Sequence, residues 1–316
     1  MITHRWIPLK KGDTVDIVSP ASRCTQEELQ GAIQFIEDMG LIPRIPEPLF
    51  SDDLAFCSNS DNFRFNHLKQ ALNATDSKII WCLRGGYGSI RIAPTIAEMI
   101  PPKKAKLLIG FSDITTIHHI VNLHWGWASL HGPLLCQLGR HQLNPRDVEE
   151  IKEILFGRIE KTTFENLKPL NSWAGKNKTI CSRIIGGNLK VIQSLLGTPS
   201  YRQPPSSIIF LEDAGERGYA IDRMLVQLTQ AGFFQNCTAV IFGNFESGYE
   251  PETRNSLWPV ALAEFAKAID IPVFSELPVG HGNRQRSLPF GTRAVLNIDS
   301  SRSVISVETG ADFTQQ

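Results

Sequence analysis

The sequence predicts an α/β protein of two domains, the first built on a parallel sheet with helices on both faces. Apolar, β-rich segments alternate with segments of helical periodicity up to about residue 131, the pattern of a doubly wound sheet. The 316 residues are long for one domain and comfortable for two. We therefore expect an N-terminal α/β domain over residues 1–143, an interdomain connection over 144–178 and a smaller C-terminal α/β domain over 179–316.

The first strand and helix of the N-terminal domain are clearly marked. The segment DTVDIVSPAS is rich in strand-forming residues and is stopped by a proline. The next segment, TQEELQGAIQFIEDMG, places Leu29, Ile33 and Ile36 at helical spacing. Gly40 follows as the expected C-terminal cap of this helix.

The same alternation continues to Ser112. A helix is expected after the glycine turn RGGYGS, and the strand KLLIG leads almost directly to this serine. The remaining expected elements of this half are strands over 41–45 and 78–83 and a helix over 61–73.

The connection and the C-terminal domain differ in character. Residues 144–178 combine a charged helix with a polar, less periodic stretch, as is typical of a domain connection. Apolar strands then return in SSIIFLED, TAVIFGNF and IPVFSELPVG, and the two halves of AVLNIDSSRSVISVE predict a hairpin. These segments predict a second α/β domain with a mixed sheet.

Composition excludes several classes of partner. Thirty-two basic residues balance 32 acidic ones, which removes the electrostatic argument for nucleic acid or an anionic membrane. The N-terminal residues lack the apolar core of a signal peptide, and no apolar run approaches the roughly 20 residues of a membrane span. Six scattered cysteines show no metal-ligand spacing. We expect a cytoplasmic protein with reduced cysteines, no metal and no cofactor.

Polar residues at strand ends mark the candidate site, because ligands bind at the carboxyl edge of open α/β sheets. Ser112 follows one strand in IGFSDIT, and Glu212 ends another in FLEDAGE. His281 lies between two glycines in PVGHGNRQRSLPFG, after a third strand. All three occupy loop or element-terminal positions, where catalytic groups concentrate.

These three residues suit nucleophilic catalysis. A serine hydroxyl needs a base to take its proton, and the base works best when a carboxylate orients it. Ser112, His281 and Glu212 fit these roles. If Ser112 opens a helix, the backbone N–H of Asp113 points at the reacting centre, and the backbone of Gly86 in RGGYGS offers a second oxyanion donor.

Each residue also has a structural interpretation. A serine at a helix start is commonly only a cap, and Ile114 stands where a G-x-S-x-G elbow has its second glycine. Glu212 with Asp213 fits a solvated strand end, and Glu216 with Arg217 fits a surface pair. His281 fits an ordinary loop residue. His118 and His119, on the helix after Ser112, are expected to point away from it.

Six motifs in order resemble the LD-carboxypeptidase family of serine peptidases, which includes muramoyltetrapeptide carboxypeptidases and microcin C immunity peptidases. They are LKKGDTVDIVSPAS, RGGYGSIRI, GFSDITTIHHI followed by LHGP, GGNLKVIQSLLGTP, FLEDAGERGYAIDRMLVQL and GHGNRQRSLPFG. The resemblance implies a flavodoxin-like N-terminal domain carrying the nucleophile and a swivelling β/α C-terminal domain carrying the other triad members. It also implies a homodimer.

The resemblance assigns a role to each candidate residue. It implies a Ser-His-Glu triad of Ser112, His281 and Glu212, with an oxyanion hole from the N–H groups of Gly86 and Asp113. The implied activity is hydrolysis of an L,D peptide bond, releasing terminal D-Ala from murein tetrapeptide in cell-wall recycling. The chain departs from the family at Cys181 and Ser182, where many relatives have an acidic residue and a glycine, in a segment that borders the substrate side of the cleft in the family.

Two other functions stay open at this point. The first is cleavage of peptidyl or aminoacyl nucleotides, as in the microcin immunity branch, for which Trp173 is the candidate platform for the base. The second is a non-catalytic nucleotide- or peptide-binding module, in which RGGYGS only cradles an anion.

Overall fold

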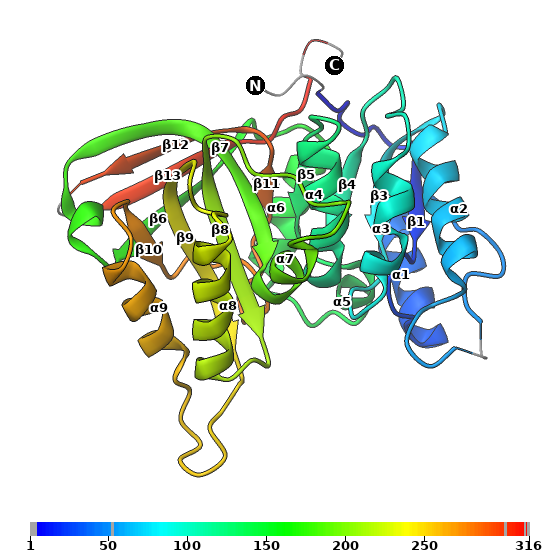
Figure 1. Ribbon diagram of the computed structural model, residues 1–316. Helices are drawn as coiled ribbons and strands as arrows, with labels where there is room; N and C mark the ends of the chain where they lie inside the picture. Colours follow the sequence, from blue (N-terminus) through cyan, green and yellow to red (C-terminus); the bar gives the residue numbers. More distant parts are fainter. Residues whose placement is uncertain (1–4, 52–53, 300–301, 313, 315–316) are drawn as a thin grey trace.

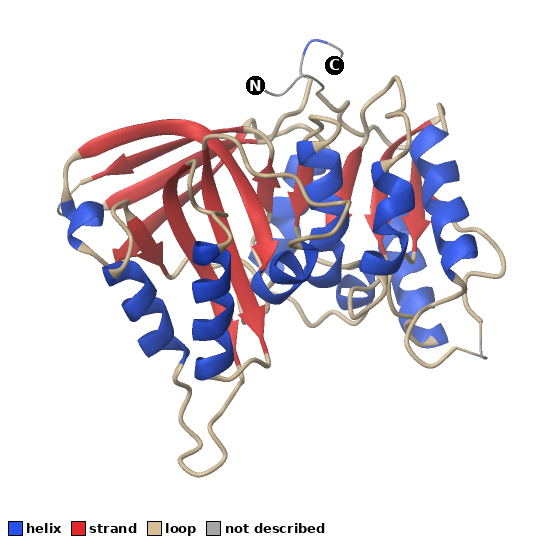
Figure 2. Cartoon of the chain, viewed as in Figure 1, coloured by secondary structure: helices blue, strands red, loops and turns tan. Residues whose placement is uncertain are grey.

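The computed structural model describes residues 5–51, 54–299, 302–312 and 314, which form two sheets side by side (Figures 1 and 2). The first is a six-stranded sheet in the order β11-β5-β4-β3-β1-β2, and the second is a closed barrel in the order β10-β6-β13-β12-β7-β8-β9. The expected α/β fold with a parallel N-terminal sheet is confirmed. The mixed second sheet is also confirmed, and its strands close on themselves.

The N-terminal sheet has five parallel strands and an antiparallel edge strand, β11. Its strands are β1 (Thr14–Val18), β2 (Ile42–Arg44), β3 (Ser77–Cys82), β4 (Leu107–Gly110), β5 (Ser129–His131) and β11 (Leu288–Phe290). The accompanying helices are α1 (Gln26–Asp38), α2 (Asp61–Asn73), α3 (Ser89–Ala97), α4 (Thr115–Leu123), α5 (Leu135–Gly139) and α6 (Pro145–Leu155), with a 3₁₀ turn η1 (Ser112–Ile114).

Local sequence explains the ends of α1. Thr25 accepts a hydrogen bond from the backbone N–H of Glu28, and the Glu28 side chain accepts one from the N–H of Thr25, which completes a capping box. After the helix, Gly40 adopts φ 73°, the left-handed conformation that commonly follows a helix.

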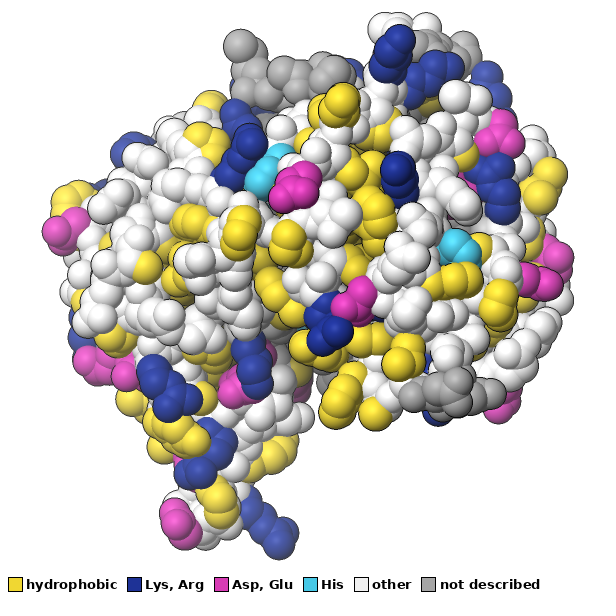
Figure 3. All heavy atoms as spheres, turned by 45° about the vertical axis from the view of Figure 1, so that its right-hand side comes forward, with side chains coloured by type: hydrophobic (Ala, Val, Ile, Leu, Met, Phe, Trp, Pro, Cys, Tyr) yellow, Lys and Arg dark blue, Asp and Glu magenta, His cyan; other side chains and the backbone are white. Residues whose placement is uncertain are grey.

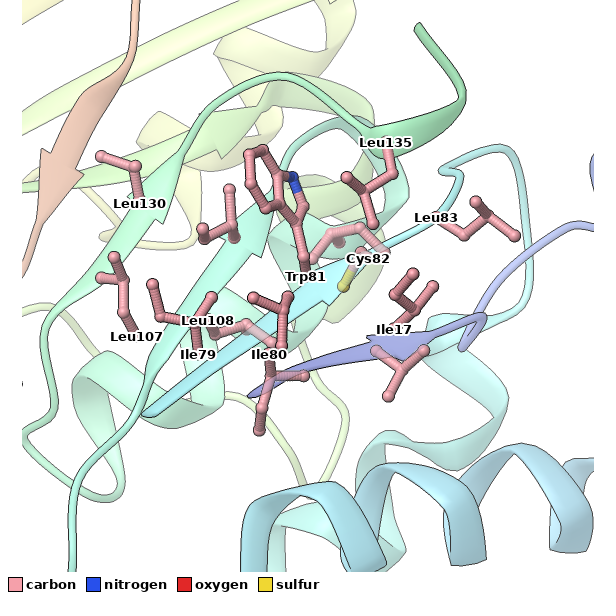
Figure 4. Close-up of a cluster of buried hydrophobic side chains, with 14 of the residues drawn as sticks. Ile17, Ile79, Ile80, Trp81, Cys82, Leu83, Leu107, Leu108, Leu130 and Leu135 are labelled. Carbon is pink, nitrogen blue, oxygen red and sulfur yellow. The ribbon is translucent and has the colours of Figure 1, made fainter. Parts of the chain in front are cut away.

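The core of the N-terminal sheet explains why its central strand reads as one apolar run. Ile79, Ile80 and Trp81 of β3 are all fully buried, because helices cover both faces of the sheet. Figure 4 shows these side chains on both faces of the strand. The Trp81 indole N–H donates to the carbonyl of Pro133 at 2.8 Å, so its one polar group is satisfied.

The barrel strands have two apolar faces. Ile184, Phe210 and Ile241 point into the barrel, whereas the next positions along each strand pack outward against helices. The strands are β6 (Lys161–Pro169), β7 (Lys178–Asn188), β8 (Ser207–Ala214), β9 (Cys237–Glu246), β10 (Val273–Ser275), β12 (Arg293–Ile298) and β13 (Ser303–Glu308). The other elements are α7 (Leu189–Leu195), α8 (Gly218–Gln230), α9 (Trp258–Lys267) and the 3₁₀ turn η2 (Ser172–Gly175).

Three features join the two halves. Strand β6 lies inside the expected connection 144–178 but belongs to the barrel. Strand β11 lies inside the expected C-terminal domain 179–316 but pairs with β5 of the N-terminal sheet. Gly187 lies against Thr115 of α4, where a Cβ atom would overlap the Thr115 hydroxyl. The chain therefore crosses between the sheets more often than the expected division implies, and the division itself stays a prediction.

The described surface carries both signs of charge. Figure 3 shows acidic and basic side chains interspersed with apolar ones over one face. Within the described ranges, no helix is both long enough and apolar enough to cross a membrane. The same residues contain no group of three or more His, Cys, Asp or Glu side chains arranged to hold a metal ion.

Candidate active site

A cavity of about 400 Å³ lies at the junction of the two sheets. Its walls come from η1, the ends of β7 and β8, the glycine turn before α3, the first turns of α3, α4 and α7, and the loop after β10. Ser112, Asp113, Gly86 and His281 all contribute to these walls. The fold thus brings together candidate residues from distant parts of the chain.

Ser112 adopts a backbone conformation that is unusual for a residue with a side chain. Its φ is 62°, between β4 and the first turn of η1. A non-glycine residue in this region carries strain and occurs often at functional sites. Phe111, not Ser112, occupies the cap position of η1, and among the described residues no side chain caps this turn. The helix-cap interpretation of Ser112 is therefore wrong, and the turn is a sharp strand-to-helix bend without the second glycine of the usual elbow.

The Asp113 carboxylate ties this bend to the glycine turn. It is buried and accepts a hydrogen bond from the backbone N–H of Ser89 at 2.8 Å, at the start of α3. Burial raises the pKa of the Asp113 carboxyl, although hydrogen bonds from Ser89 act in the opposite direction. The bend that holds Ser112 and the turn that holds Gly86 are therefore fixed to each other.

Close contacts also hold the glycine turn against Ser112. A Cβ atom on Gly85 would lie 3.0 Å from the Ser112 Cβ atom. The carbonyl of Gly88 accepts a hydrogen bond at 3.0 Å from Arg64, whose buried guanidinium also donates to the carbonyl of Pro20 and pairs with Asp61. One buried cation thus links the loop after β1, the glycine turn and α2.

His281 and Glu212 form a hydrogen-bonded pair. Nδ1 of His281 lies 2.6 Å from Oε2 of Glu212, which is fully buried. The Asn188 side-chain amide donates to the other oxygen of Glu212 at 3.4 Å. Gly280 allows this approach, because a Cβ atom there would lie 2.7 Å from Glu212 Oε2. The carboxylate therefore fixes the ring orientation and leaves Nε2 as the remaining ring nitrogen.

The pKa of His281 reflects two opposing effects. Burial lowers the pKa of the imidazole. The charge of Glu212, its hydrogen bond and the charge of Asp213 together raise the pKa by more than burial lowers it, so the net pKa lies above its ordinary value. The buried pair thus favours an imidazolium, the form that a base takes after it has accepted a proton.

Distant ion pairs anchor the loop that carries His281. Arg284 makes bidentate hydrogen bonds to the buried carboxylate of Asp147 on α6, with contacts at 2.6 and 3.0 Å. Arg286 contacts Glu150 of the same helix at 3.0 Å. Helix α6 lies in the expected interdomain connection, so this segment positions the histidine loop.

Charged groups of both signs line the cavity beside the candidate triad. Lys190 and Glu216 form an ion pair there. Asp213 is buried and accepts hydrogen bonds from the N–H groups of Lys190 and Ala214 at 2.9 and 2.7 Å. The sequence interpretation missed these three roles, although Lys190 lies inside the motif GGNLKVIQSLLGTP and both carboxylates lie inside FLEDAGERGYAIDRMLVQL.

Several structural interpretations from the sequence fail. Glu212 and Asp213 are buried rather than solvated. Glu216 pairs with Lys190, whereas Arg217 pairs with Glu250, so Glu216 and Arg217 do not form the expected pair.

Other expectations concern residues outside the cavity. His118 and His119 are buried away from the cavity, as expected. The ring nitrogens of His118 form hydrogen bonds with the Ser129 hydroxyl and the Gly110 carbonyl. Trp173 lies in η2, where the ammonium group of Lys176 packs over its ring, and it does not line the cavity. Cys181 and Ser182 line a different cavity and are not among the described residues that line this one.

Ser112 and His281 face the same cavity without a direct bond. Among the described residues, no hydrogen bond joins the Ser112 hydroxyl to the imidazole. The ring of His281 packs on Phe111 instead, with 4.6 Å between ring centroids, next to Ser112 in the chain. Catalytic hydrogen bonds are often long without substrate and shorten in the substrate complex.

Comparison with known proteins identifies the family. Residues 15–132 match the family model for the LD-carboxypeptidase N-terminal domain, and residues 181–296 match that for the LD-carboxypeptidase C-terminal domain. The chain belongs to the LD-carboxypeptidase family. The six motifs quoted above lie within or beside these two matches.

Individual relatives agree with this assignment. A putative carboxypeptidase of Rickettsia conorii is 34% identical over 86% of this chain and 84% of its own length. A probable murein peptide carboxypeptidase of Bacillus subtilis is 30% identical over 94% and 92%.

Solved structures show the same fold. The muramoyltetrapeptide carboxypeptidase of Oxalobacter formigenes superposes with a TM-score of 0.80 at 24% identity, covering 95% of this chain and 99% of that one. The microcin C7 immunity protein MccF, in complex with glutamyl sulfamoyl guanosine, gives 0.79 at 19% identity, covering 98% and 99%.

Proposed function

We propose that this chain is a serine carboxypeptidase that releases a terminal D-amino acid, D-Ala, from murein tetrapeptide by cleaving an L,D peptide bond. The observation that carries the proposal is the 2.6 Å contact between the fully buried Glu212 and His281, whose ring lies on the wall of the cavity that Ser112 faces from a strained bend. Membership of the LD-carboxypeptidase family and the named murein peptide carboxypeptidases support the substrate class.

The proposed reaction is acyl transfer through the triad. His281 takes the proton of Ser112 as its Oγ attacks the scissile carbonyl, and Glu212 stabilises the imidazolium. The N–H groups of Gly86 and Asp113 hold the oxyanion, and the contacts of Asp113 and Arg64 keep their two loops in register. The terminal amine then leaves with a proton from His281. Water, activated by the same base, hydrolyses the acyl-enzyme.

The cavity suits a peptide end that carries both signs of charge. Lys190 and Glu216 offer one cation and one anion within it. Trp173, the candidate platform for a base, does not line the cavity, whereas Tyr87 of the glycine turn does. Nucleotide cleavage, the microcin-type alternative, therefore becomes an outcome of the test. On the family resemblance alone, we extend the proposal to a cytoplasmic homodimer that acts in cell-wall recycling.

A serine substitution with a matched control tests the proposal. Wild type, Ser112→Ala and Ser194→Ala would be incubated with murein tetrapeptide, and released D-Ala would be measured by mass spectrometry. Ser194 lines the same cavity, but its hydroxyl bonds the Lys190 carbonyl within its own helix. We expect release from wild type and Ser194→Ala, and a loss on the order of 10⁴-fold or more in Ser112→Ala.

A parallel incubation with a peptidyl adenylate separates the alternatives. Nucleotide product from wild type, without D-Ala from tetrapeptide, would replace the proposal with the immunity-type activity. No product from either substrate would favour a binding module. Equal D-Ala release by wild type and Ser112→Ala would exclude Ser112 as the nucleophile.

A further inference from the structure

A second cavity, of about 460 Å³, opens beside the middle of β7, away from the candidate active site at the end of that strand. Arg183 of β7 lies on its wall, whereas Asn188, five positions along the same strand, lies on the wall of the first cavity. Five strand residues span about 17 Å. The two cavities share no lining residue, so this one is separate from the Ser112 site.

The lining of this second cavity brings like charges together. Among the described lining residues, Arg5, Arg183 and Arg293 contribute three guanidinium groups against one carboxylate, that of Glu308. Arg183 and Arg293 are also direct cross-strand partners in the antiparallel pairing of β7 with β12. Like charges directly opposite each other destabilise a sheet, so this arrangement costs stability unless an anion offsets it.

The protein itself neutralises little of this charge. Arg293 lies 3.4 Å from Glu308, but both side chains are exposed, so the pair is weak. Among the described residues, the Arg5 guanidinium donates to the Ala311 carbonyl alone, at 3.4 Å. In the part of the chain that the structure describes, the guanidinium of Arg183 has no hydrogen-bond or ion-pair partner.

A buried hydroxyl on the same wall is also unpaired. Thr292 is fully buried, and its hydroxyl oxygen has no hydrogen-bond partner among the described residues. Leaving a buried polar group unpaired costs roughly 1–3 kcal/mol. This hydroxyl has no exposed surface, so the guanidinium groups are the ones that a ligand in the cavity contacts.

We propose that this cavity binds a small molecule through a phosphate monoester group. Guanidinium groups match phosphate oxygens in geometry as well as charge. Three cations and one anion leave two positive charges, which a phosphate monoester with about −1.5 to −2 at pH 7 balances better than a single carboxylate does. The volume exceeds that of inorganic phosphate, so the cavity also has room for the body of a small phosphorylated metabolite.

Calorimetric titration at fixed ionic strength tests this site. Inorganic phosphate, glycerol phosphate and acetate would be titrated into wild type, Arg183→Met, Arg293→Met and the control Arg302→Met, which removes an exposed arginine of the β12–β13 hairpin region paired with Glu165. We expect saturable binding of both phosphates to wild type and the control, and at least about tenfold weaker binding to Arg183→Met and Arg293→Met. Circular dichroism would establish that each variant is folded.

A reciprocal variant sharpens the result. Glu308→Gln removes the one competing carboxylate, so phosphate should bind more tightly than to wild type. Ser112→Ala should bind phosphate as wild type does, which separates this site from the proposed peptidase activity. The proposal is overturned if wild type shows no saturable phosphate binding, if acetate binds as tightly as phosphate, or if Arg183→Met binds like the control.

Discussion

The Ser112 bend and the His281 loop reach the same cavity by different routes. Ser112 is positioned locally: β4 ends at Gly110, the chain turns with φ 62° at Ser112, and η1 begins at once. His281 lies in a loop without regular secondary structure, held by Glu212 on β8 and by an α6 carboxylate through Arg284. A local bend and a loop anchored by distant residues therefore differ in what can disturb them.

Because of this difference, the two parts of the candidate site should respond to different substitutions. Contacts around Ser112 come from neighbouring elements of one sheet, including the Asp113 contact with Ser89. The histidine loop depends on Glu212, 69 positions before His281, and on Asp147, 137 positions before Arg284. Substitutions that act through distant partners should therefore affect His281 first, and the following predictions test this, from the largest effect to the smallest.

Glu212→Gln should have the largest effect. The amide keeps the shape of the carboxylate but loses the charge that stabilises the His281 imidazolium, and its NH₂ group can hold the ring in the wrong tautomer. We expect kcat to fall on the order of 10³-fold in the D-Ala release assay. Glu264→Gln, on the exposed face of α9, should match wild type. A Glu212→Gln enzyme with wild-type kcat would remove Glu212 from the mechanism.

Gly280→Ala should displace the pair without removing a catalytic group. Gly280 has φ 111°, and an added Cβ atom would lie 2.7 Å from Glu212 Oε2. A displacement near 1 Å at reacting groups costs about 10²-fold in rate. The control is Gly197→Ala, which has φ 77° and open space around the new methyl group, so it carries backbone strain alone. Equal kcat/KM for the two variants would contradict the steric explanation.

Arg284→Met should loosen the histidine loop and destabilise the fold. It leaves the buried Asp147 carboxylate with only the backbone N–H of Gln285, at 2.9 Å. We expect about 3 kcal/mol of lost unfolding free energy, measured by urea denaturation, and a fall in kcat/KM of about tenfold. Arg302→Met breaks an exposed pair instead and should cost less than about 1 kcal/mol. An unchanged kcat/KM in a destabilised Arg284→Met would show that the anchor does not position His281.

Asp213→Asn should have the smallest effect on rate, visible in the pH profile. Because a base must be neutral to accept a proton, kcat/KM should rise with pH through the raised pKa of His281. Asp213 contributes to that rise in pKa, so its loss should move the acid limb to lower pH and leave the plateau of kcat near wild type. An acid limb at the wild-type position would exclude this coupling.

We also expect Asp213→Asn to change how the free energy of unfolding depends on pH. Burial, and next the charge of Glu212, raise the pKa of Asp213 from 3.8 to about 7 in the folded protein. The folded state therefore binds more protons than the unfolded state between these values, so stability falls as pH rises from about 4 to about 7. Asp213→Asn should lack this loss, as measured by urea unfolding at the two ends of this interval, near pH 4 and above pH 7.

Most elements were predictable from the sequence because their signals are local. The periodicity of α1, its Thr25 cap and the β-rich hairpin of β12 and β13 needed no knowledge of distant residues. Strand-end positions likewise pointed to Ser112 and Glu212 as candidates. The closed barrel and the place of β11 in the first sheet were not predictable in this way, since strand pairing joins segments far apart in sequence.

The α/β class, the family resemblance and the residue types available for acyl transfer follow from the amino-acid sequence alone. Only the tertiary structure decided that Glu212 is buried behind His281, that Ser112 is strained rather than a cap, and that Asp147 anchors a loop 137 positions away. It also decided that Arg183 and Arg293 lie opposite each other across β7 and β12. The physical reason is that burial, pKa and charge repulsion depend on the distances between side chains, and folding sets those distances.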